Sequence, residues 1–267
     1  MENTIGFIGT GNMGGALARA AAKAVPGENI YLFDIFTEKA QALASELGCN
    51  CGTLENISEC RYIFLGVKPQ MMAELFEQLS VKLAQRNDEF VLVSMAAGLK
   101  MERIQELAGY KYPVIRIMPN MPVSVGCGMI EYDTTENVTE AQLEGFLQLM
   151  QYAGVLDKLP EELIDAGTSV AGCGPAFAFL FIEALTQGGM ECGLTEEQAM
   201  LYAKQMLLGS AKLALESDNH PSWLREAVCS PGGSTIEGVR VLQNGQFSEL
   251  VADAVKASYK RNQELGK

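Results

Sequence analysis

Three glycines near the start of the chain have a spacing that suits a phosphate group. Gly9, Gly11 and Gly14 form a G-x-G-x-x-G pattern after the apolar run Thr4–Ile8 and at the start of the alanine-rich segment Asn12–Ala24. Gly9 allows a tight turn, Gly11 lets backbone N–H groups approach a pyrophosphate, and Gly14 lets a helix pack close to a strand. A helix that begins here adds N–H donors and the positive end of its dipole, so the pattern predicts a dinucleotide-binding loop. The loop residues expected to contact the dinucleotide are Ile8, Gly9, Thr10, Gly11, Asn12, Met13 and Gly14.

An acidic residue stands at the end of the second expected strand. Asp34 lies 20 residues beyond Gly14, at a distance where an acid binds the 2′-hydroxyl of a ribose. A carboxylate there repels a 2′-phosphate, and Lys39 is the only cation nearby, so these residues favour NADH over NADPH. The alternative is that Asp34 only caps the helix expected from about Thr37.

Two further loops follow expected strands. One contains Val67 and Lys68, and the other contains Ala96 and Ala97. Ligands of doubly wound sheets lie beyond the carboxyl ends of the strands, so we expect both loops to border the cofactor. Lys68 would meet a phosphate or a substrate carboxylate, or would simply be solvated.

A second unusual segment, Ser230–Thr235, reads Ser-Pro-Gly-Gly-Ser-Thr and enters a helix. The spacing of Ser234 and Glu237 is that of a capping box. The same geometry makes an anion site, because the N–H groups of Gly233, Ser234 and Thr235 would hold a carboxylate. The hydroxyls of Ser230 and Thr235 add donors or acceptors that can be oriented.

The first half of the chain alternates short apolar runs with segments of helical spacing, which predicts a parallel, doubly wound sheet. The expected strands are Thr4–Ile8, Asn29–Asp34, Tyr62–Val67, Phe90–Ala96, Val114–Met118, Met129–Tyr132 and Val155–Leu159. The expected helices are Asn12–Ala24, Thr37–Leu47, Met71–Gln85, Met101–Leu107 and Thr139–Tyr152.

After about Pro160 no strand pattern remains. Pro175–Cys192 is apolar on almost all sides and is expected to be a helix buried on most faces, followed by helices at 195–216 and 247–265. We therefore expect an α/β Rossmann-type dinucleotide-binding domain at residues 1–160 and an all-helical domain at 161–267. An apolar surface as large as that of Pro175–Cys192 marks an interface, which predicts an obligate dimer through the helical domain.

Composition excludes several function classes. The 267 residues carry a formal net charge of −13, which argues against a nucleic-acid partner. The single histidine, His220, excludes sites built on several histidines, so no metal is expected, and a turn or capping role suits this residue best. Seven cysteines without a Cys-x-x-Cys pattern indicate reduced cytosolic thiols.

The chain is also expected to lack membrane and export signals. Its first residues, Met-Glu-Asn-Thr, lack the basic region of a signal peptide. The longest uncharged apolar run, Val170–Ile182, is shorter than the roughly 18 residues that a membrane span needs. These features predict a soluble, cytoplasmic protein without a membrane partner.

Six segments together resemble the pyrroline-5-carboxylate reductase family, and the resemblance covers essentially the whole chain. The Ser-Pro-Gly-Gly-Ser-Thr-Ile turn is the most specific of them. The segments are, in order, Asn12-Met13, Val67-Lys68-Pro69, Ala96-Ala97-Gly98, Arg116–Pro122, Gly172–Ala176 and Ser230–Glu237.

The resemblance implies reduction of 1-pyrroline-5-carboxylate to L-proline with NAD(P)H, the last step of proline biosynthesis. It also implies a homodimer, or a higher oligomer of such dimers, with substrate in a helical dimer interface near Ser230 and Thr235. Asp218 resembles the acidic position shortly before the family's His-Pro pair. The family often prefers NADPH, which conflicts with Asp34, so NADPH and NADH both stay open.

Two residues depart from the family pattern. Met121 stands where the family usually has threonine, and Cys173 stands where it usually has serine. Hydroxyl contributions at these two positions are therefore not expected in this chain. The Ser230–Thr235 turn is intact, so the departures leave the expected reaction unchanged.

The residue inventory suits the reduction of an imine. A protonated cyclic imine is already an electrophile, so the enzyme mainly has to orient it against the nicotinamide and hold its carboxylate. We expect Thr235 to be the catalytic residue, hydrogen-bonding to the imine nitrogen to orient it or to relay a proton through water. The expected substrate-binding residues are Asp218, Ser230, Gly233, Ser234 and Thr235.

Two other functions compete with this one. A β-hydroxyacid dehydrogenase would need Gly-x-x-x-Lys-x-x-Asn, but Lys212 lies one residue too close to Gly209, and Leu215 replaces the asparagine. A non-catalytic NAD(P)-binding sensor would need no second anion site, which the Ser230–Thr235 turn provides.

Overall fold

The computed structural model describes residues 4–265. Residues 1–3 and 266–267, which include most of the Met-Glu-Asn-Thr segment and the outer ends of the two predicted domains, lie outside the described range. The chain forms two compact units. The sheet unit comprises the chain up to Cys173 and the segment from Ser258 onward, and the helical unit comprises Gly174–Ala257. This division follows Cys173, and the chain returns to the sheet unit at Ser258. The domain boundary expected at residue 160 stays a prediction.

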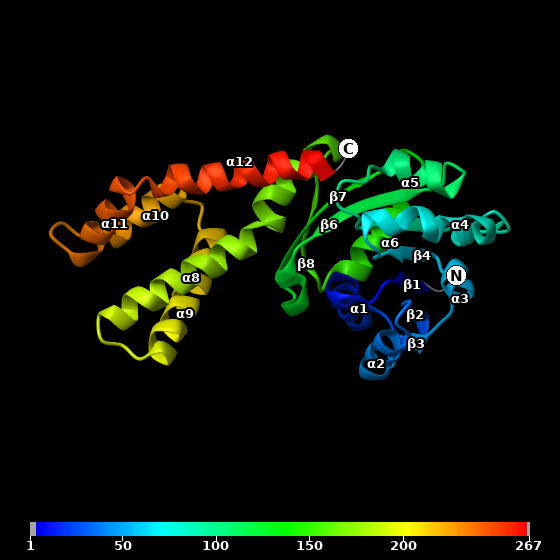
Figure 1. The fold of residues 1–267 in the computed structure, drawn as a ribbon, viewed down its shortest axis with the longest axis horizontal. Helices are drawn as coiled ribbons and strands as arrows, with labels where there is room; N and C mark the ends of the chain where they lie inside the picture. The colour runs from blue at the N-terminus through cyan, green and yellow to red at the C-terminus, as the bar shows by residue number, and fades with distance from the viewer. Residues whose placement is uncertain (1–3, 266–267) are drawn as a thin grey trace. The chain divides into compact units, whose positions relative to one another are not determined.

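The sheet unit is built on eight strands in the order β3-β2-β1-β4-β5-β6-β7-β8 (Figure 1). The order reverses between β1 and β4, because β2 and β3 lie on one side of β1 and β4 returns to the other. This reversal creates a crevice at the carboxyl ends of β1 and β4, which is where such sheets bind ligands. The strands are β1 (Ile5–Ile8), β2 (Ile30–Phe33), β3 (Asn50–Cys51), β4 (Tyr62–Leu65), β5 (Val91–Ser94), β6 (Val114–Pro119), β7 (Gly128–Thr134) and β8 (Gly154–Lys158).

All neighbouring strands are parallel except β6 and β7, which are antiparallel. The connection between these two strands holds only the short helix η3 (Met121–Val125). A parallel crossover needs a dozen or more residues, so this short connection can only join antiparallel neighbours. The predicted doubly wound sheet is therefore confirmed as Rossmann-like, with one antiparallel pair that the strand pattern did not indicate.

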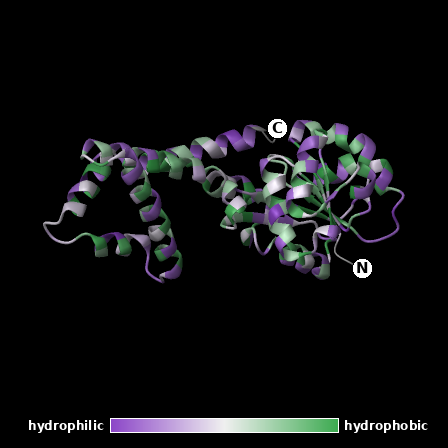
Figure 2. Ribbon diagram, turned by 90° about the horizontal axis from the view of Figure 1, so that it is seen from below, coloured by the Kyte–Doolittle hydropathy of each residue, from purple (hydrophilic) through white to green (hydrophobic). Residues whose placement is uncertain are grey.

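Helices cover both faces of the sheet and enclose two hydrophobic clusters. One cluster contains Phe7, Leu17 and Phe146, all fully buried, and the other contains Ile63, Phe76 and Leu92. Figure 2 shows hydrophobic residues concentrated in the interior of this unit. The helices are α1 (Asn12–Ala24), η1 (Gly27–Asn29), α2 (Thr37–Leu47), α3 (Leu54–Ser58), η2 (Pro69–Met71), α4 (Met72–Leu83), α5 (Met101–Ala108), α6 (Glu140–Met150), η4 (Glu161–Leu163), α7 (Ile164–Gly167) and the π-helical η5 (Thr168–Gly172).

The helical unit contains no strand among its described residues, as expected. Its helices α8 and α9 pack against each other, and Gly189 of α8 lies close to Ala199 of α9. Thr195 begins α9 with a capping box to Gln198. The helices of this unit are α8 (Gly174–Glu191), α9 (Glu196–Glu216), α10 (Pro221–Val228), α11 (Ser234–Asn244) and α12 (Phe247–Leu265), the last of which continues into the sheet unit.

The expectation that the Pro175–Cys192 helix is buried on most faces is wrong for a single chain. In α8 only Thr186 is buried, whereas Phe179 and Leu180 are 50% and 66% exposed. The physical reason is that the described helices of this unit do not enclose α8, so its apolar surface has no cover within one copy.

One helical run is long and apolar enough to cross a membrane by length and composition alone. It spans Glu161–Glu191, with a mean hydropathy of 1.5 in its best window and 6% of that window buried. The uncharged run Val170–Ile182 is shorter than a membrane span, so it did not indicate a helix of this length. The longer helix includes a few charged residues, which a membrane-spanning helix tolerates near its ends. A single helix of this kind is weak evidence for a membrane span, since an uncovered interface helix has the same composition.

Candidate functional site: a dinucleotide cavity and a separate anion-binding turn

The glycine loop connects the carboxyl end of β1 to α1 and is held by backbone hydrogen bonds. The N–H of Gly9 donates to the carbonyl of Phe33 at 2.8 Å, and the N–H of Gly66 donates to the carbonyl of Ile8 at 2.7 Å. Gly9 has φ +93°, and a Cβ at this position would stand 2.5 Å from the carbonyl oxygen of Gly66. Only glycine fits here, so the ends of β1, β2 and β4 approach each other closely.

The N-terminus of α1 offers an open cradle for an anion. Gly11 is the N-cap, and within the described chain no side chain caps the helix. The first N–H groups of a helix lack intrahelical partners, so these donors are available. A Cβ on Gly14 would collide with the carbonyl oxygen of Gly9, whereas nothing lies within 4 Å of a Cβ on Gly11. The space beside Gly11 therefore fits the pyrophosphate of a dinucleotide.

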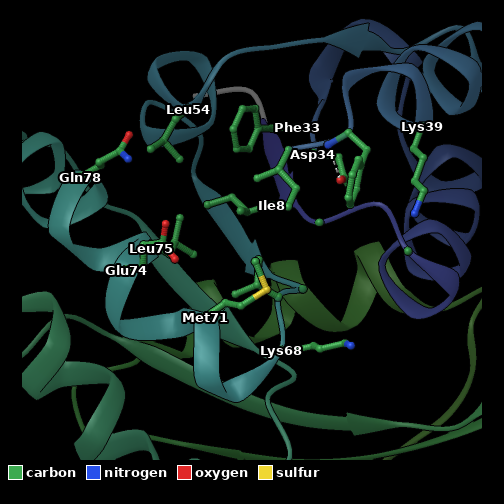
Figure 3. Close-up of a pocket in the computed structure, with 16 residues that line it drawn as sticks. Ile8, Phe33, Asp34, Lys39, Leu54, Lys68, Met71, Glu74, Leu75 and Gln78 are labelled. Atoms are coloured by element: carbon green, nitrogen blue, oxygen red, sulfur yellow. Dashed lines mark hydrogen bonds between the residues drawn. The ribbon is translucent and has the colours of Figure 1, made fainter.

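A cavity of about 320 Å³ lies beside this loop, at the reversal point of the strand order (Figure 3). In Figure 3, Leu54, Met71 and Leu75 lie on one side of the cavity, and Asp34 and Lys39 lie on the other. An apolar slot next to a polar rim suits a nucleoside, whose planar base is apolar on its faces and whose sugar is polar. The cavity is lined by Ile8, Gly9, Gly11, Phe33, Asp34, Ile35, Phe36, Lys39, Leu54, Gly66, Val67, Lys68, Met71, Glu74, Leu75 and Gln78.

Asp34 is fixed at the edge of this cavity by three donors. Its Oδ2 accepts hydrogen bonds from the backbone N–H of Thr10 at 2.8 Å and from the Thr10 hydroxyl at 3.0 Å. Its Oδ1 accepts from the N–H of Phe36 at 2.9 Å. Phe36 is the N-cap of α2, and no side chain caps that helix within residues 4–265. Asp34 is therefore not the N-cap of α2, although it accepts from the N–H of the N-cap residue, and its role toward a ribose stays a prediction.

Not all of the residues predicted to contact a cofactor line the cavity. Asn12 and Met13 belong to the first turn of α1, and Gly14 is buried behind it. Ala96 packs into the second hydrophobic cluster, while Ala97 is exposed in the loop after β5. Val67 and Lys68, in contrast, lie in the cavity wall as expected from their position after β4.

Several apolar residues of the cavity were not singled out from the sequence. Ile35 and Phe36 follow β2, and Met71 and Leu75 lie on η2 and α4. Phe36 is 56% exposed and carries the Lys39 ammonium 4.9 Å from its ring centre. Their position directly after the carboxyl ends of β2 and β4 was the available signal, since that edge of the sheet binds ligands.

The Ser230–Thr235 turn in the helical unit leads into α11. The predicted capping box of Ser234 and Glu237 is wrong, because Gly233 is the N-cap and Glu237 instead pairs with Arg240. The N–H of Gly233 donates to the carbonyl of Ser230 at 3.0 Å and is therefore occupied. The N–H groups of Ser234 and Thr235, in the first turn of α11, are the donors that this turn can offer to an anion.

The predicted substrate residues of this unit lie at its surface. Ser230, Ser234 and Thr235 are exposed, as is Asp218 in the connection between α9 and α10. The expected capping role of His220 is confirmed, because its Nδ1 accepts from the N–H of Ser222 at 3.2 Å. Within residues 4–265, no group of three or more His, Cys, Asp or Glu side chains is placed to hold a metal ion.

The two positions that depart from the resemblance lie at the ends of short helices of the sheet unit. Met121 begins η3 and is 60% exposed. Cys173 is half-buried and directly follows η5. Neither residue lines the cavity beside the glycine loop.

Two parts of the chain match separate family profiles. Residues 161–265 match the family described as "Pyrroline-5-carboxylate reductase dimerisation", and residues 4–98 match "NADP oxidoreductase coenzyme F420-dependent". The class that the fold and the site define is thus a dinucleotide-dependent oxidoreductase with a helical dimerisation domain.

Known proteins narrow this class. The pyrroline-5-carboxylate reductase of Escherichia coli is 34% identical over 272 residues, and the similarity covers 100% of both chains. The solved reductase of Coxiella burnetii matches with a TM-score of 0.91 and 29% identity over 99% of both chains. The Plasmodium falciparum reductase, solved with NADP bound, matches with a TM-score of 0.88 and 27% identity over 100% of this chain and 99% of that one. The chain belongs to the pyrroline-5-carboxylate reductase family.

Proposed function

We propose that this chain reduces 1-pyrroline-5-carboxylate to L-proline, with NADH or NADPH as the hydride donor, as the last step of proline biosynthesis. The observation that carries the proposal is the full-length similarity to the E. coli reductase. The intact Ser230–Thr235 turn supports it, because this is the most specific segment of the family pattern.

The substrate explains why so few acid–base residues are needed. A protonated cyclic imine accepts a hydride without further activation, and the bound dinucleotide supplies that hydride from its nicotinamide ring. The protein therefore has to hold the substrate carboxylate, orient the imine carbon and exclude competing geometries. The single histidine of the chain is a helix cap, which agrees with a reaction that requires no histidine.

The cofactor residues of the proposal come from the sheet unit. The N–H groups at the start of α1, from Gly11, Asn12 and Met13, hold the pyrophosphate in the space beside Gly11. Ile8, Gly9, Thr10 and Gly14 shape that loop. Val67 and Lys68, together with the loop of Ala96 and Ala97, border the rest of the dinucleotide at the carboxyl ends of β4 and β5.

We further propose that Asp34 gives the enzyme a preference for NADH. Its carboxylate faces the cavity from the end of β2, where it accepts a ribose hydroxyl and repels a 2′-phosphate. Asp34→Ser should raise the efficiency with NADPH relative to NADH, measured as the ratio of the two kcat/KM values. If the wild type prefers NADPH and Asp34→Ser leaves that preference unaltered, Asp34 does not select the cofactor.

The substrate residues of the proposal come from the helical unit. The N–H groups of Ser234 and Thr235 bind the carboxylate at the start of α11. The Thr235 hydroxyl bonds to the imine nitrogen, and the Ser230 hydroxyl and the turn at Gly233 complete the site. Asp218 is included because the family pattern places an acidic residue there.

Assembly and location complete the proposal. The homodimer forms through the helical unit and covers the exposed apolar side chains of α8, with higher oligomers built from such dimers. That cover also accounts for the apolar run Glu161–Glu191 without a membrane. The enzyme is then a soluble cytoplasmic protein, and its net charge of −13 leaves nucleic acid outside its partners.

The experiment that tests the function is a spectrophotometric assay of purified protein. NADH and NADPH are each incubated with 1-pyrroline-5-carboxylate, and the loss of reduced-nicotinamide absorbance is compared with the proline formed. We expect one proline for each dinucleotide oxidised. Oxidation of neither dinucleotide, by protein whose fold and assembly are intact, would contradict the proposal.

A further inference from the structure

Thr10, the second residue of the glycine loop, donates two hydrogen bonds to Asp34, the residue proposed to select the cofactor. Thr10 is 9% exposed, and it donates both its backbone N–H and its hydroxyl to the same oxygen, Oδ2 of Asp34. Phe36 donates its N–H to the other oxygen, Oδ1. An ionised carboxylate has about four acceptor sites, two on each oxygen. Three of them are already used inside the protein, and only one site, on Oδ1, remains for a ligand.

This count bears directly on how well Asp34 can bind a ribose. A ribose without a 2′-phosphate offers two neighbouring hydroxyls, and an acid at the end of the second strand gains most when it accepts from both. With Oδ2 occupied twice, Asp34 has room for one of these bonds. The Thr10 hydroxyl is the one donor of the three that belongs to a side chain, so it is the one that evolution or mutagenesis can remove without changing the backbone.

The charges around Asp34 act in the same direction. Three donors spread the negative charge of the carboxylate, which weakens its repulsion of a 2′-phosphate. Lys39 on α2 and Lys68 after β4 line the same cavity, while Glu74 on α4 is its other acidic side chain (Figure 3). A phosphate at the ribose would therefore meet a carboxylate that already accepts from three donors, in a cavity that also contains the side chains of Lys39 and Lys68.

We propose that Thr10 sets the strength of cofactor selection: its hydroxyl occupies an acceptor site on Asp34 and so holds the preference for NADH below what that aspartate alone would give. The inference rests on the proposed use of NADH or NADPH at this loop. Thr10 acts through Asp34 and is therefore a positioning residue rather than a catalytic one. The backbone N–H groups of Thr10 and Phe36 each hold one carboxylate oxygen, so the orientation of Asp34 does not depend on the hydroxyl.

The test compares Thr10→Val with Thr10→Ser. Valine keeps the branched shape and the backbone N–H but lacks the hydroxyl, whereas serine keeps the hydroxyl. The dissociation constants of NADH and NADPH are measured by fluorescence titration without substrate, so the result does not depend on turnover. We expect Thr10→Val to increase the Kd ratio of NADPH to NADH by about 2- to 13-fold, the range of one hydrogen bond, and Thr10→Ser to keep the wild-type ratio. An unchanged or decreased ratio in Thr10→Val would overturn the proposal.

A second comparison separates this proposal from loop damage. In an Asp34→Ala background the side chain at position 34 has no acceptor, so Thr10→Val should leave the NADPH to NADH ratio unchanged. A shift of equal size in both backgrounds shows that the substitution acts on the loop itself, and the proposal is then wrong. Wild-type protein that binds neither dinucleotide would overturn both this inference and the proposed function, whereas binding of both with an unmoved ratio would overturn the inference alone.

Discussion

The sheet unit and the helical unit differ in how completely one chain can bury their apolar side chains. In the sheet unit Phe7, Phe64 and Phe146 are fully buried inside clusters closed by helices on both faces. In the helical unit, among the described residues, only Thr186, Ala199 and Ala203 are buried. A unit that exposes so much apolar surface does not gain enough from burial to offset its conformational entropy. The sheet unit therefore has its own core, whereas the described helical unit lacks one, which agrees with the proposal that a second copy of the chain covers it.

This difference separates the two tasks of the proposed enzyme. The dinucleotide cavity and the α1 cradle are formed entirely by residues of the sheet unit. The Ser230–Thr235 turn belongs to the helical unit, whose core is incomplete in one chain. Loss of the dimer should consequently abolish catalysis but spare dinucleotide binding, and the following variants test that separation.

The largest effect is expected from a charge on the uncovered face of α8. Leu180 is 66% exposed, and Leu180→Asp should dissociate the dimer because a carboxylate cannot be buried unpaired in an apolar interface. We expect activity to fall by about 100-fold or more, with the Kd for NADH within about twofold of the wild type. The matched control is Val81→Asp, which places the same charge at a 59% exposed site of the sheet unit. Equal loss of activity in Leu180→Asp and Val81→Asp would show that the exposed face of α8 is no more important for activity than the surface of the sheet unit.

The next effect separates two glycines of the cofactor loop. A Cβ on Gly14 meets the Gly9 carbonyl, so Gly14→Ala should lower Tm by several degrees and weaken dinucleotide binding by about 100-fold. A Cβ on Gly11 meets no protein atom within 4 Å, so Gly11→Ala should leave Tm within about 2 °C yet weaken binding by about tenfold. Thermal unfolding and NADH titration of both variants provide the readouts. Normal binding by Gly11→Ala would mean that no pyrophosphate lies beside that residue.

A smaller effect is expected at the substrate turn. Removal of one neutral hydrogen bond costs about 0.5–1.5 kcal/mol, so Thr235→Ala should lower kcat/KM for the imine by roughly 2- to 13-fold, and by more if the bond strengthens in the transition state. Thr235→Ser should retain more activity because it keeps a hydroxyl. Since no side chain of the described residues caps α11, circular dichroism should not change. A folded Thr235→Ala enzyme with wild-type kcat and KM would transfer the substrate contact to Ser230.

The smallest effect concerns Glu131, a buried carboxyl of the sheet unit. Glu131 is 3% exposed and, within the described structure, its Oε2 has no hydrogen-bond partner. Burial raises the pKa of Glu131, and the charge of Asp157 raises it further. A raised pKa means that the folded state binds the proton more tightly than the unfolded state does. The contribution of Glu131 to the free energy of unfolding therefore falls as the pH rises above the pKa of an ordinary carboxyl group.

Glu131→Gln removes this titration and should raise Tm by a few degrees at pH 7 to 8, with the gain decreasing toward pH 4. Thermal unfolding of both proteins from pH 4 to pH 8 provides the measurement. Two Tm curves that run parallel over this range would show that Glu131 is not protonated preferentially in the folded state.

Local patterns in the sequence predicted much of the sheet unit. The β1–loop–α1 segment depends on neighbouring residues, so the order of apolar run, glycines and alanine-rich helix was enough to place it. The bonds from Thr10 to Asp34 join residues 24 positions apart and have no local signature. The antiparallel β7 did have a local signal, because the connection between β6 and β7 is too short for a parallel crossover, but the alternation of strands and helices alone does not indicate it.

Two errors in the helical unit have different physical causes. The spacing of Ser234 and Glu237 fits a capping box, but α11 starts one residue earlier than that box requires, with Gly233 as its N-cap. The burial of α8 was predicted from its apolar composition. That composition indicates that the helix must be covered, but it does not indicate whether the same chain or a second copy covers it. The sequence predicted an interface through the helical domain, and the structure shows that the described part of one chain leaves α8 uncovered.

The measurement that tests the central claim most directly is light scattering of the purified wild-type protein at micromolar concentration. If the helical unit completes its core with a second copy, the particle mass is at least twice the 28.9 kDa of one chain and is an even multiple of it. This mass should persist on dilution, because an obligate interface of apolar helices does not dissociate readily. A monodisperse particle of 28.9 kDa that still reduces the imine would contradict the account.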